Sequence, residues 1–316
     1  MDILYVHPAK QEADARFDLY KAGSPYPFIP VGVIGLVNML RQQGWNVEGL
    51  NLPVELLLKP DFDFKMWLAI QSPAKLVMID LHWYEHSFGA MDVAESVKKV
   101  WPNTPIVIGG LTATHFSFEI IRDFPAVDYI ICGDSEEPLA LLAKYIADPE
   151  NSDISLDDIP NLVYRKNDEP AWNMRRYTAT SEDLNNLDFV TTDWLHHHNN
   201  YAAVQCSGAG IIKLEGAEVR GHWLAVGRGC TFDCSYCGGG KKSHETLAGR
   251  DGYIQRDPIL VVDDIEVLAE KGIQQIALSL DPATFKPKWW QALFSEIKKR
   301  EIKVGLYNEF FQLPSK

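Results

Sequence analysis

The first 150 residues alternate short apolar runs with longer amphipathic segments, and this alternation restricts the possible folds more than any other feature. Five runs have the length and composition of buried strands: Ile3 to Val6, Asn46 to Leu50, Lys75 to Ile79, Pro105 to Ile108 and Tyr129 to Cys132. Three segments between them have helical spacing of apolar residues: Val31 to Gln43, Ala90 to Val100 and Glu136 to Ile146. The pattern predicts an α/β domain over residues 1–147, in which helices cover both faces of a doubly wound parallel sheet.

The chain changes character after residue 147. Residues 148–220 are acidic and polar with short apolar runs, which predicts a linker with a small hairpin around Leu162 to Trp172. The alternation resumes over residues 221–316, with these predicted strands and helices: His222 to Val226, Pro258 to Lys271, Gln275 to Leu280, Pro287 to Lys299 and Lys303 to Tyr307. This order predicts the first part of a β/α barrel. Because three strands cannot close a barrel, we expect the chain to continue past Lys316 or a partner to cover the last strand.

Composition and charge exclude several classes of protein. The chain has 30 basic and 43 acidic side chains, a formal net charge of -13, and clustered basic residues are what non-specific nucleic-acid binding requires. The N-terminus has no basic region followed by an apolar one, and prolines interrupt the uncharged stretch Ala22 to Leu40. We therefore expect a cytoplasmic protein that binds no nucleic acid and has no membrane span.

Three of the five cysteines, Cys230, Cys234 and Cys237, lie within eight residues. An odd, clustered set is not a disulfide framework, and three thiolates on one loop can converge on a soft metal centre. An iron-sulfur cube needs four ligands, so three cysteines leave one iron open. The alternative is a structural zinc site completed by His244 or Cys206, although zinc loops favour two paired CxxC units.

The CxxxCxxC loop resembles the motif of radical SAM enzymes. The resemblance implies that Cys230, Cys234 and Cys237 hold a [4Fe-4S] cluster and that S-adenosylmethionine (SAM) chelates the fourth iron. It places Tyr236 against the adenine and assigns the adjoining Gly238 to the same cofactor. In that family an electron from the cluster splits SAM, and the resulting 5′-deoxyadenosyl radical abstracts a hydrogen atom. A donor such as flavodoxin or ferredoxin is then the implied protein partner.

The family usually carries a Gly-Gly-Glu-like segment at the second barrel strand, which meets the methionine amino group. Here that strand ends Leu278-Ser279-Leu280-Asp281, without the glycines. Ser279 and Asp281 are the candidate SAM contacts, because a carboxylate can receive the ammonium group; a helix-cap role for Asp281 is the alternative. Asn308 and Glu309 are similarly placed after the third strand.

Two segments of the first domain, residues 106–115 and 124–137, resemble in order and spacing the cobalamin-binding domain that precedes the radical domain in one branch of that family. A Gly-Gly pair at a strand end lets a bulky flat ligand approach the backbone, and a second glycine loop follows the next strand. The resemblance assigns cobalamin contacts to these residues: Gly109, Gly110, Leu111, Thr112, Gly133 and Glu136.

Mutase-type cobalamin domains supply a lower axial histidine from an Asp-x-His-x-x-Gly motif after the first strand. The loop after His7 lacks this motif. A similar tripeptide, Asp80-Leu81-His82, follows the third strand instead, with Glu85 where the glycine would stand. We therefore expect Asp80, Leu81 and His82 to line the corrin, with no histidine on the cobalt.

The resemblance covers nearly the whole chain. It implies a cobalamin-dependent radical SAM enzyme that acts on a small-molecule substrate, most commonly by methyl transfer to an inert carbon or phosphorus centre. One alternative is a radical enzyme whose outcome is cyclisation or rearrangement. Another is a corrinoid or iron-sulfur carrier without catalysis.

Overall fold

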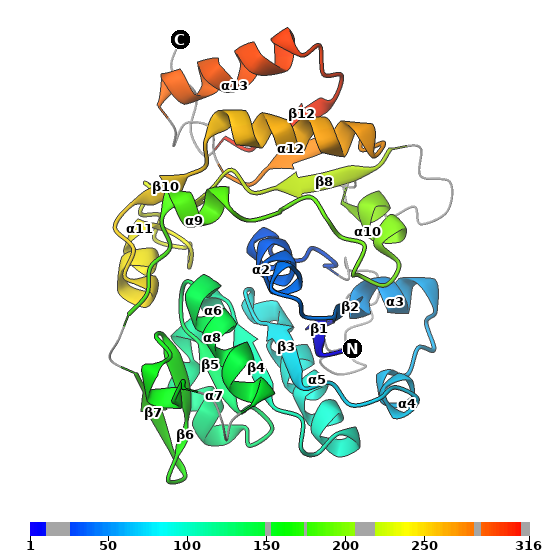
Figure 1. The fold of residues 1–316 in the computed structure, drawn as a ribbon, viewed down its shortest axis with the longest axis vertical. Coiled ribbons are helices and arrows are strands. Elements are labelled where there is room, and N and C mark those ends of the chain that lie inside the picture. The colour runs from blue at the N-terminus through cyan, green and yellow to red at the C-terminus, as the bar shows by residue number, and fades with distance from the viewer. Residues whose placement is uncertain (11–25, 149–152, 174–175, 206–218, 281–285, 311–316) are drawn as a thin grey trace.

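The computed structural model describes residues 1–10, 26–148, 153–173, 176–205, 219–280 and 286–310 (Figure 1). Five parallel strands form most of its larger sheet: β1 Ile3–His7, β2 Val47–Asn51, β3 Leu76–Asp80, β4 Ile106–Gly109 and β5 Tyr129–Ile131. They lie side by side in the order β2-β1-β3-β4-β5. Each strand predicted in this domain is confirmed to within one residue at either end.

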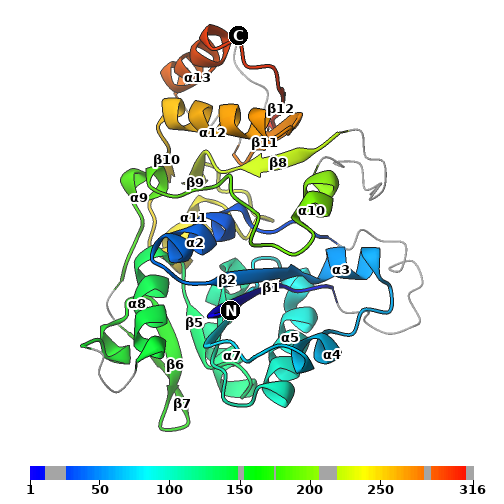
Figure 2. The ribbon, with the colours of Figure 1, turned by 45° about the vertical axis from the view of Figure 1, so that its right-hand side comes forward.

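Helices cover both faces of this sheet (Figure 2). Their bounds are α2 Val31–Gln42, α5 Ser87–Val100, α7 Ser117–Asp123 and α8 Glu136–Ala147. Successive strand residues point to opposite faces, so Tyr5 packs with α2 and α8 whereas Val6 packs with α5 and α7. A sheet buried on both faces explains why its strands are almost wholly apolar, and the predicted doubly wound sheet is confirmed.

Several short helices were not predicted: α3 Leu52–Leu58, α4 Phe64–Ala69, the 3₁₀ turns η1 Tyr84–His86 and η2 Leu156–Asp158, and α6 Leu111–His115. One or two turns are too short to show a helical repeat of apolar residues. Two of them, η1 and α6, follow strand ends, where they shape the edge described below.

The predicted hairpin is present as β6 Leu162–Lys166 and β7 Glu169–Trp172, and β6 pairs antiparallel with β5. Its turn residues, Asn167 and Asp168, have the positive φ angles that a tight hairpin needs. Two short helices follow: α9 Ser181–Asn185 and α10 His198–Val204. This segment packs on both halves of the chain, because Trp194 joins the core beside α2 and Phe189 joins that of the second sheet. The domain boundaries at 147 and 220 stay a prediction.

A second, three-stranded parallel sheet has the order β12-β11-β8. Its strands and its helices are β8 Gly221–Leu224, β11 Gln275–Leu278, β12 Gly305–Tyr307, α12 Pro258–Glu270 and α13 Pro287–Lys299. The predicted strands and helices of this region are thus all found. None of the helices in the described ranges is long and apolar enough to cross a membrane.

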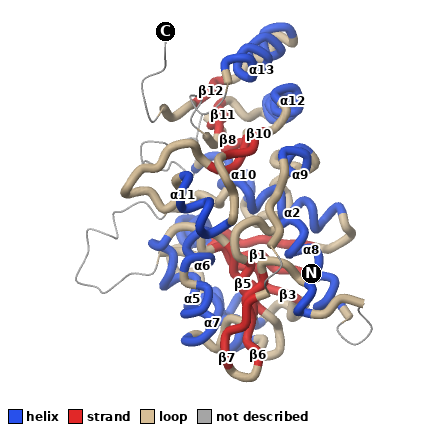
Figure 3. Tube along the Cα trace, turned by 90° about the vertical axis from the view of Figure 1, so that its left-hand side faces the viewer, coloured by secondary structure: helices blue, strands red, loops and turns tan. Residues whose placement is uncertain are grey.

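The cysteine loop leaves this second sheet after β8. Its two ends are paired as the antiparallel strands β9 Gly227–Gly229 and β10 Tyr253–Gln255. Two short helical turns follow the cysteines, α11 Lys241–Ser243 and the π-helical turn η3 His244–Ala248. Figures 1 and 3 show α11 between the two sheets, beside the carboxyl ends of the larger sheet's strands.

Candidate functional site

The carboxyl ends of β3, β4 and β5 form one edge, here called the strand-end edge (residues 80–82, 109–112 and 133–136). Gly110 has φ +114°, and a Cβ there would lie 2.7 Å from the backbone of Leu81 and His82, so the fold itself requires this glycine. Gly109 is different, because among the described residues a Cβ on it would meet a single atom within 4 Å, the Ile131 carbonyl oxygen at 4.0 Å. The neighbouring glycines therefore have different roles: one allows two loops to touch, and the other leaves space beside the strand end.

Hydrogen bonds join the three loops of this edge. The Thr112 hydroxyl donates to the His82 carbonyl at 2.9 Å, and the Gly133 N–H donates to the Thr114 hydroxyl at 3.0 Å. The Leu81 N–H donates to the Gly109 carbonyl at 2.7 Å. The structure thus brings the predicted cobalamin contacts after β3, β4 and β5 into one connected surface.

The three side chains of the 80–82 loop differ in their surroundings and their contacts. Leu81 is buried in the core beneath the edge. Burial lowers the pKa of His82 to about 4, partly opposed by Asp80, so its ring is neutral at pH 7. The Asp80 carboxylate is also buried and contacts side chains of β1. Corrin contact by these three residues stays a prediction.

The cysteine loop presents three free thiols. Cys230 and Cys234 are half-buried and Cys237 is exposed. The Phe232 N–H donates to the Cys230 sulfur at 3.3 Å, and the Gly239 N–H donates to the Cys237 sulfur at 3.4 Å. The backbone around two of the three sulfur atoms is thus arranged to donate hydrogen bonds to them.

The two kinds of metal centre require different spacings of their ligand atoms. Zinc-sulfur bonds of about 2.3 Å bring tetrahedral ligands to within about 3.8 Å of one another. Among the described residues, the one group of three metal-binding side chains with ligand atoms within 4.8 Å contains neither a cysteine nor His244. Cys206 lies outside the described residues. The described cysteines are therefore not gathered, with or without His244, at the spacing of three ligands of one zinc ion, and three thiols are the number that leaves one iron of a cluster open.

The cysteine loop rests directly against the strand-end edge. A Cβ on Gly239 would lie 3.6 Å from the Leu111 side chain and 3.9 Å from the Cys237 sulfur. A Cβ on Gly133 would lie 3.0 Å from the Ala248 Cα. Leu111, a predicted corrin contact, and Cys237, a predicted cluster ligand, therefore both lie within 4 Å of the Cβ position of Gly239.

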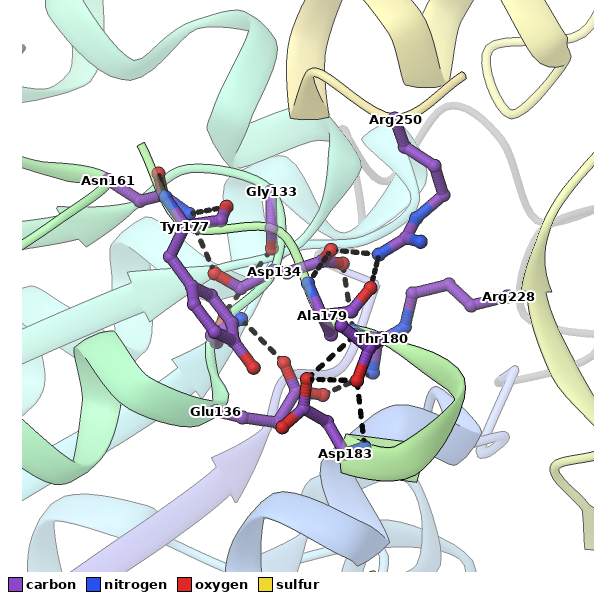
Figure 4. Close-up of polar contacts among 11 residues, drawn as sticks. Gly133, Asp134, Glu136, Asn161, Tyr177, Ala179, Thr180, Asp183, Arg228 and Arg250 are labelled. Carbon is purple, nitrogen blue, oxygen red and sulfur yellow. Dashed lines mark hydrogen bonds and ion pairs between the residues drawn. The ribbon is translucent and has the colours of Figure 1, made fainter. Parts of the chain in front are cut away.

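A buried ion-pair network joins the same two parts (Figure 4). Asp134 accepts hydrogen bonds from Arg228 Nη1 at 2.8 Å, from the Ala179 N–H at 2.8 Å and from Arg250 Nη2. Arg228 Nη2 also donates to Glu136 Oε1 at 2.6 Å. Because Arg228 precedes the cysteines and Arg250 follows them, one carboxylate holds both ends of the cysteine loop.

The charges of this network balance, with two carboxylates facing two guanidinium groups. Asp134 and Arg250 are only 3–4% exposed, and the Arg228 side chain is 21% exposed. Burial acts to lower the pKa of Arg228, but Glu136 and Asp134 raise it overall, so Arg228 remains charged. Glu136 was predicted to contact cobalamin; the structure places it against Arg228, and a cofactor role stays a prediction.

Sequence reasoning missed Asp134, Arg228 and Arg250. The sequence predicts that the loop from Gly133 to Glu136 binds a ligand, but the arginine partners of its Asp134 lie 94 and 116 residues away along the chain. A single sequence carries no signal for such a pairing. Burial of charged side chains is visible only once the chain is folded.

Of the predicted SAM contacts, Ser279 lies at the second sheet, directly after β11. The half-buried Ser279 hydroxyl accepts a hydrogen bond from the Val226 N–H at 3.3 Å, which ties the ends of β11 and β8 together. Asp281 lies outside the described residues. Tyr236 is 89% exposed, and a Cβ on Gly238 would meet no atom of the described residues within 4 Å, so both lie on the open side of the cysteine loop.

Comparison with known proteins agrees with this arrangement. The B12 binding domain family matches residues 19–143, which include the whole strand-end edge. The solved structure of the radical S-adenosylmethionine methyltransferase TsrM from Kitasatospora setae, with tryptophan and a SAM analog bound, matches 95% of this chain. The TM-score is 0.64 at 19% identity, and the match covers 51% of TsrM. Residues 19–143 thus match the B12 binding domain family, and the chain as a whole shares its fold with about half of a radical SAM methyltransferase.

A second TsrM structure, with cobalamin and a [4Fe-4S] cluster bound, gives a TM-score of 0.61. Curated relatives include proteins named anaerobic magnesium-protoporphyrin IX monomethyl ester cyclase. The protein of that name from Cereibacter sphaeroides is 30% identical over 202 residues, and that from Rubrivivax gelatinosus is 25% identical over 209 residues. The chain spans 29% and 34% of these relatives and about half of TsrM. The predicted fold, a doubly wound sheet followed by the first part of a radical SAM partial barrel, is confirmed.

Proposed function

We propose that this chain binds cobalamin at the strand-end edge and a [4Fe-4S] cluster on Cys230, Cys234 and Cys237, and that it is an enzyme that uses both together with SAM. One observation carries the proposal: the cysteine loop rests on the edge, with Gly239 against Leu111. Cofactors bound at the two places would therefore be neighbours.

The residues present fit these groups. Three thiols, two of which accept a hydrogen bond from a backbone N–H, can bind three irons, and the space beside Gly109 permits a flat ligand against the backbone. When bound, the cluster with SAM supplies a carbon radical and cobalamin supplies a methyl group. The chain's own part is to hold and orient these groups, with Asp134 fixing the loop that carries the thiols.

The outcome that this arrangement supports best is methyl transfer to a small-molecule substrate. A methyl donor and a radical source must reach the same substrate atom, and the contact between Leu111 and Gly239 brings their sites together. A flavodoxin or ferredoxin is the electron donor in this proposal.

A second candidate is a radical cyclisation. It is favoured by the names of the curated relatives, which are 25–30% identical to this chain over 202–210 residues. The aligned part of each relative is 36% of its length or less, so the comparison leaves most of each relative outside the match.

The test is anaerobic reconstitution followed by incubation with methyl-deuterated SAM, a reductant and a small-molecule extract of cells. We expect about four irons per chain, release of 5′-deoxyadenosine and a deuterated methyl group in one product. The triple Cys230→Ala, Cys234→Ala, Cys237→Ala variant should lose iron and SAM cleavage but keep cobalamin.

The other outcomes separate the alternatives. If 5′-deoxyadenosine is released and a substrate is consumed but no product carries the label, the reaction is a rearrangement such as cyclisation and not methyl transfer. A protein that holds both cofactors yet never cleaves SAM would be a carrier. Iron retained by the triple variant would overturn the assignment of the cluster ligands.

A further inference from the structure

Three metal-binding side chains meet beneath the strand-end edge, apart from the cysteines. His7 ends β1, Asp80 ends β3, and His86 ends the 3₁₀ turn η1 that follows β3. One ligand atom from each lies within 4.8 Å of the others, and all three residues are at most 4% exposed. Since β1 and β3 flank the point where the strand order reverses, this cluster sits where ligands bind in such sheets.

Only some of the polar atoms in this cluster of three side chains have hydrogen-bond partners among the described residues. Asp80 Oδ1 accepts from the Tyr5 hydroxyl at 2.7 Å and from His7 Nδ1 at 2.9 Å. Asp80 Oδ2 has no hydrogen-bond partner among the described residues, and the ring nitrogens of His86 make no hydrogen bond of good geometry there, only a weak contact with the Tyr26 backbone. Buried polar atoms are nearly always paired, so unpaired or weakly paired atoms on two of three neighbouring side chains need an explanation.

We propose that His7, Asp80 and His86 bind a divalent transition-metal ion that is separate from the iron of the cysteine loop. Two imidazoles and a carboxylate are the donor set of many zinc and iron sites. A metal ion would take up the unpaired oxygen of Asp80 and one nitrogen of His86. His7 Nδ1 would exchange its hydrogen bond to Asp80 for a metal bond, and the imidazole proton would then sit on Nε2, which lies 3.2 Å from the Tyr26 carbonyl oxygen that can accept it.

The surroundings support a metal-binding role. Ligands of a tetrahedral ion at about 2.1 Å lie about 3.4 Å apart, so the three side chains need to close by little more than 1 Å from their 4.8 Å limit. The Tyr5 hydroxyl orients the carboxylate, which is the usual work of a second layer around a metal. The rings of Tyr26 and Trp83 lie beside His86 and limit the access of water.

Such an ion would link β1 to β3 directly below Leu81 and His82. It would hold the loop that we expect to line the corrin, without itself touching substrate. The inference goes beyond the proposed function and does not depend on it, because it concerns residues other than the cysteines and a different metal.

The test measures zinc binding in the triple cysteine-to-alanine variant, so that zinc cannot occupy the cysteine loop. After exposure to zinc and dialysis, we expect about one zinc per chain by elemental analysis, and X-ray absorption showing nitrogen and oxygen ligands with imidazole scattering and no sulfur. His86→Gln in the same background should weaken binding by more than about 100-fold, and Tyr5→Phe by about tenfold.

His115→Gln is the matched control, because His115 is exposed and lies on α6 away from the cluster; it should bind zinc like the parent variant. If the cysteine variant is not folded by circular dichroism, cluster-loaded wild-type protein serves instead, since zinc and iron are counted separately. Absence of bound zinc in folded protein, or equal zinc affinity in the His86→Gln variant, would overturn the proposal.

Discussion

The strand-end edge and the cysteine loop touch each other but are held in place by different forces. The edge is set by the core: all five residues of β3 are buried, and Gly110 locks two loops together. The cysteine loop has exposed or half-buried residues from Thr231 to Gly238 and is anchored by ion pairs to Asp134. The edge should therefore tolerate changes in the loop, whereas the loop should depend on a single carboxylate of the edge.

Replacing Asp134 tests this dependence most severely. Asp134→Asn would leave Arg228 and Arg250 buried with one carboxylate between them, and loss of one partner of a buried ion pair costs about 3–5 kcal/mol. We expect a lower urea midpoint and a loop that retains iron poorly after reconstitution, while cobalamin affinity changes little. Iron content and urea denaturation measure the two effects.

Asp183→Asn is the control for that variant. The Asp183 carboxylate accepts hydrogen bonds from the N–H and the hydroxyl of Thr180 at the start of α9, next to Ala179, whose N–H donates to Asp134. Asp183 is drawn beside the network but has no hydrogen bond to Arg228 or Arg250 (Figure 4). It should keep its iron. Equal losses of iron in both variants would show that the network does not position the loop.

The two edge glycines give a sharper test of where cobalamin binds. Gly109→Val points a branched side chain into open space, so the fold should persist while cobalamin affinity falls by about 10- to 100-fold, since steric overlap costs about 1–3 kcal/mol. Gly110→Ala should instead destabilise the apoprotein, because its φ is +114° and backbone atoms lie 2.7 Å away. Normal cobalamin binding by a folded Gly109→Val protein would contradict the placement.

Acid should destabilise the second sheet through His222 on β8. Burial lowers the pKa of His222 to about 4, despite its hydrogen bond to the Phe189 carbonyl at 2.8 Å. The unfolded chain takes up this proton below about pH 6.5, so stability present above that pH is lost as the pH falls towards 4. Between pH 7 and 5 the loss from this one residue is about 2 kcal/mol.

The measurement is the urea midpoint at both pH values. His222→Gln should lose less stability than wild type over this range, and the exposed His115→Gln should lose as much as wild type. The buried rings of His82 and His86, whose pKa values burial also lowers to about 4, add to the decline in every variant. If His222→Gln lost as much stability between pH 7 and 5 as wild type does, His222 would not be a source of the acid sensitivity.

The two regions also differ in how far the sequence predicts them. Runs such as Leu76 to Ile79 are recognisable because a strand buried on both faces is almost wholly apolar. The strand-end glycines were recognised because few other residues permit such close approaches. The network around Asp134 and the cluster of His7 with His86 were not, since each depends on contacts between distant residues that only the folded chain brings together.

The central claim is that the cluster and cobalamin lie side by side where Gly239 meets Leu111. The most direct measurement is the electron paramagnetic resonance spectrum of protein loaded with both cofactors, with the cluster reduced and the cobalt in its divalent state. We expect spin-spin interaction that broadens or splits both signals relative to samples loaded with one cofactor. A spectrum that is the simple sum of the two single-cofactor spectra, from protein shown to hold both, would contradict the account.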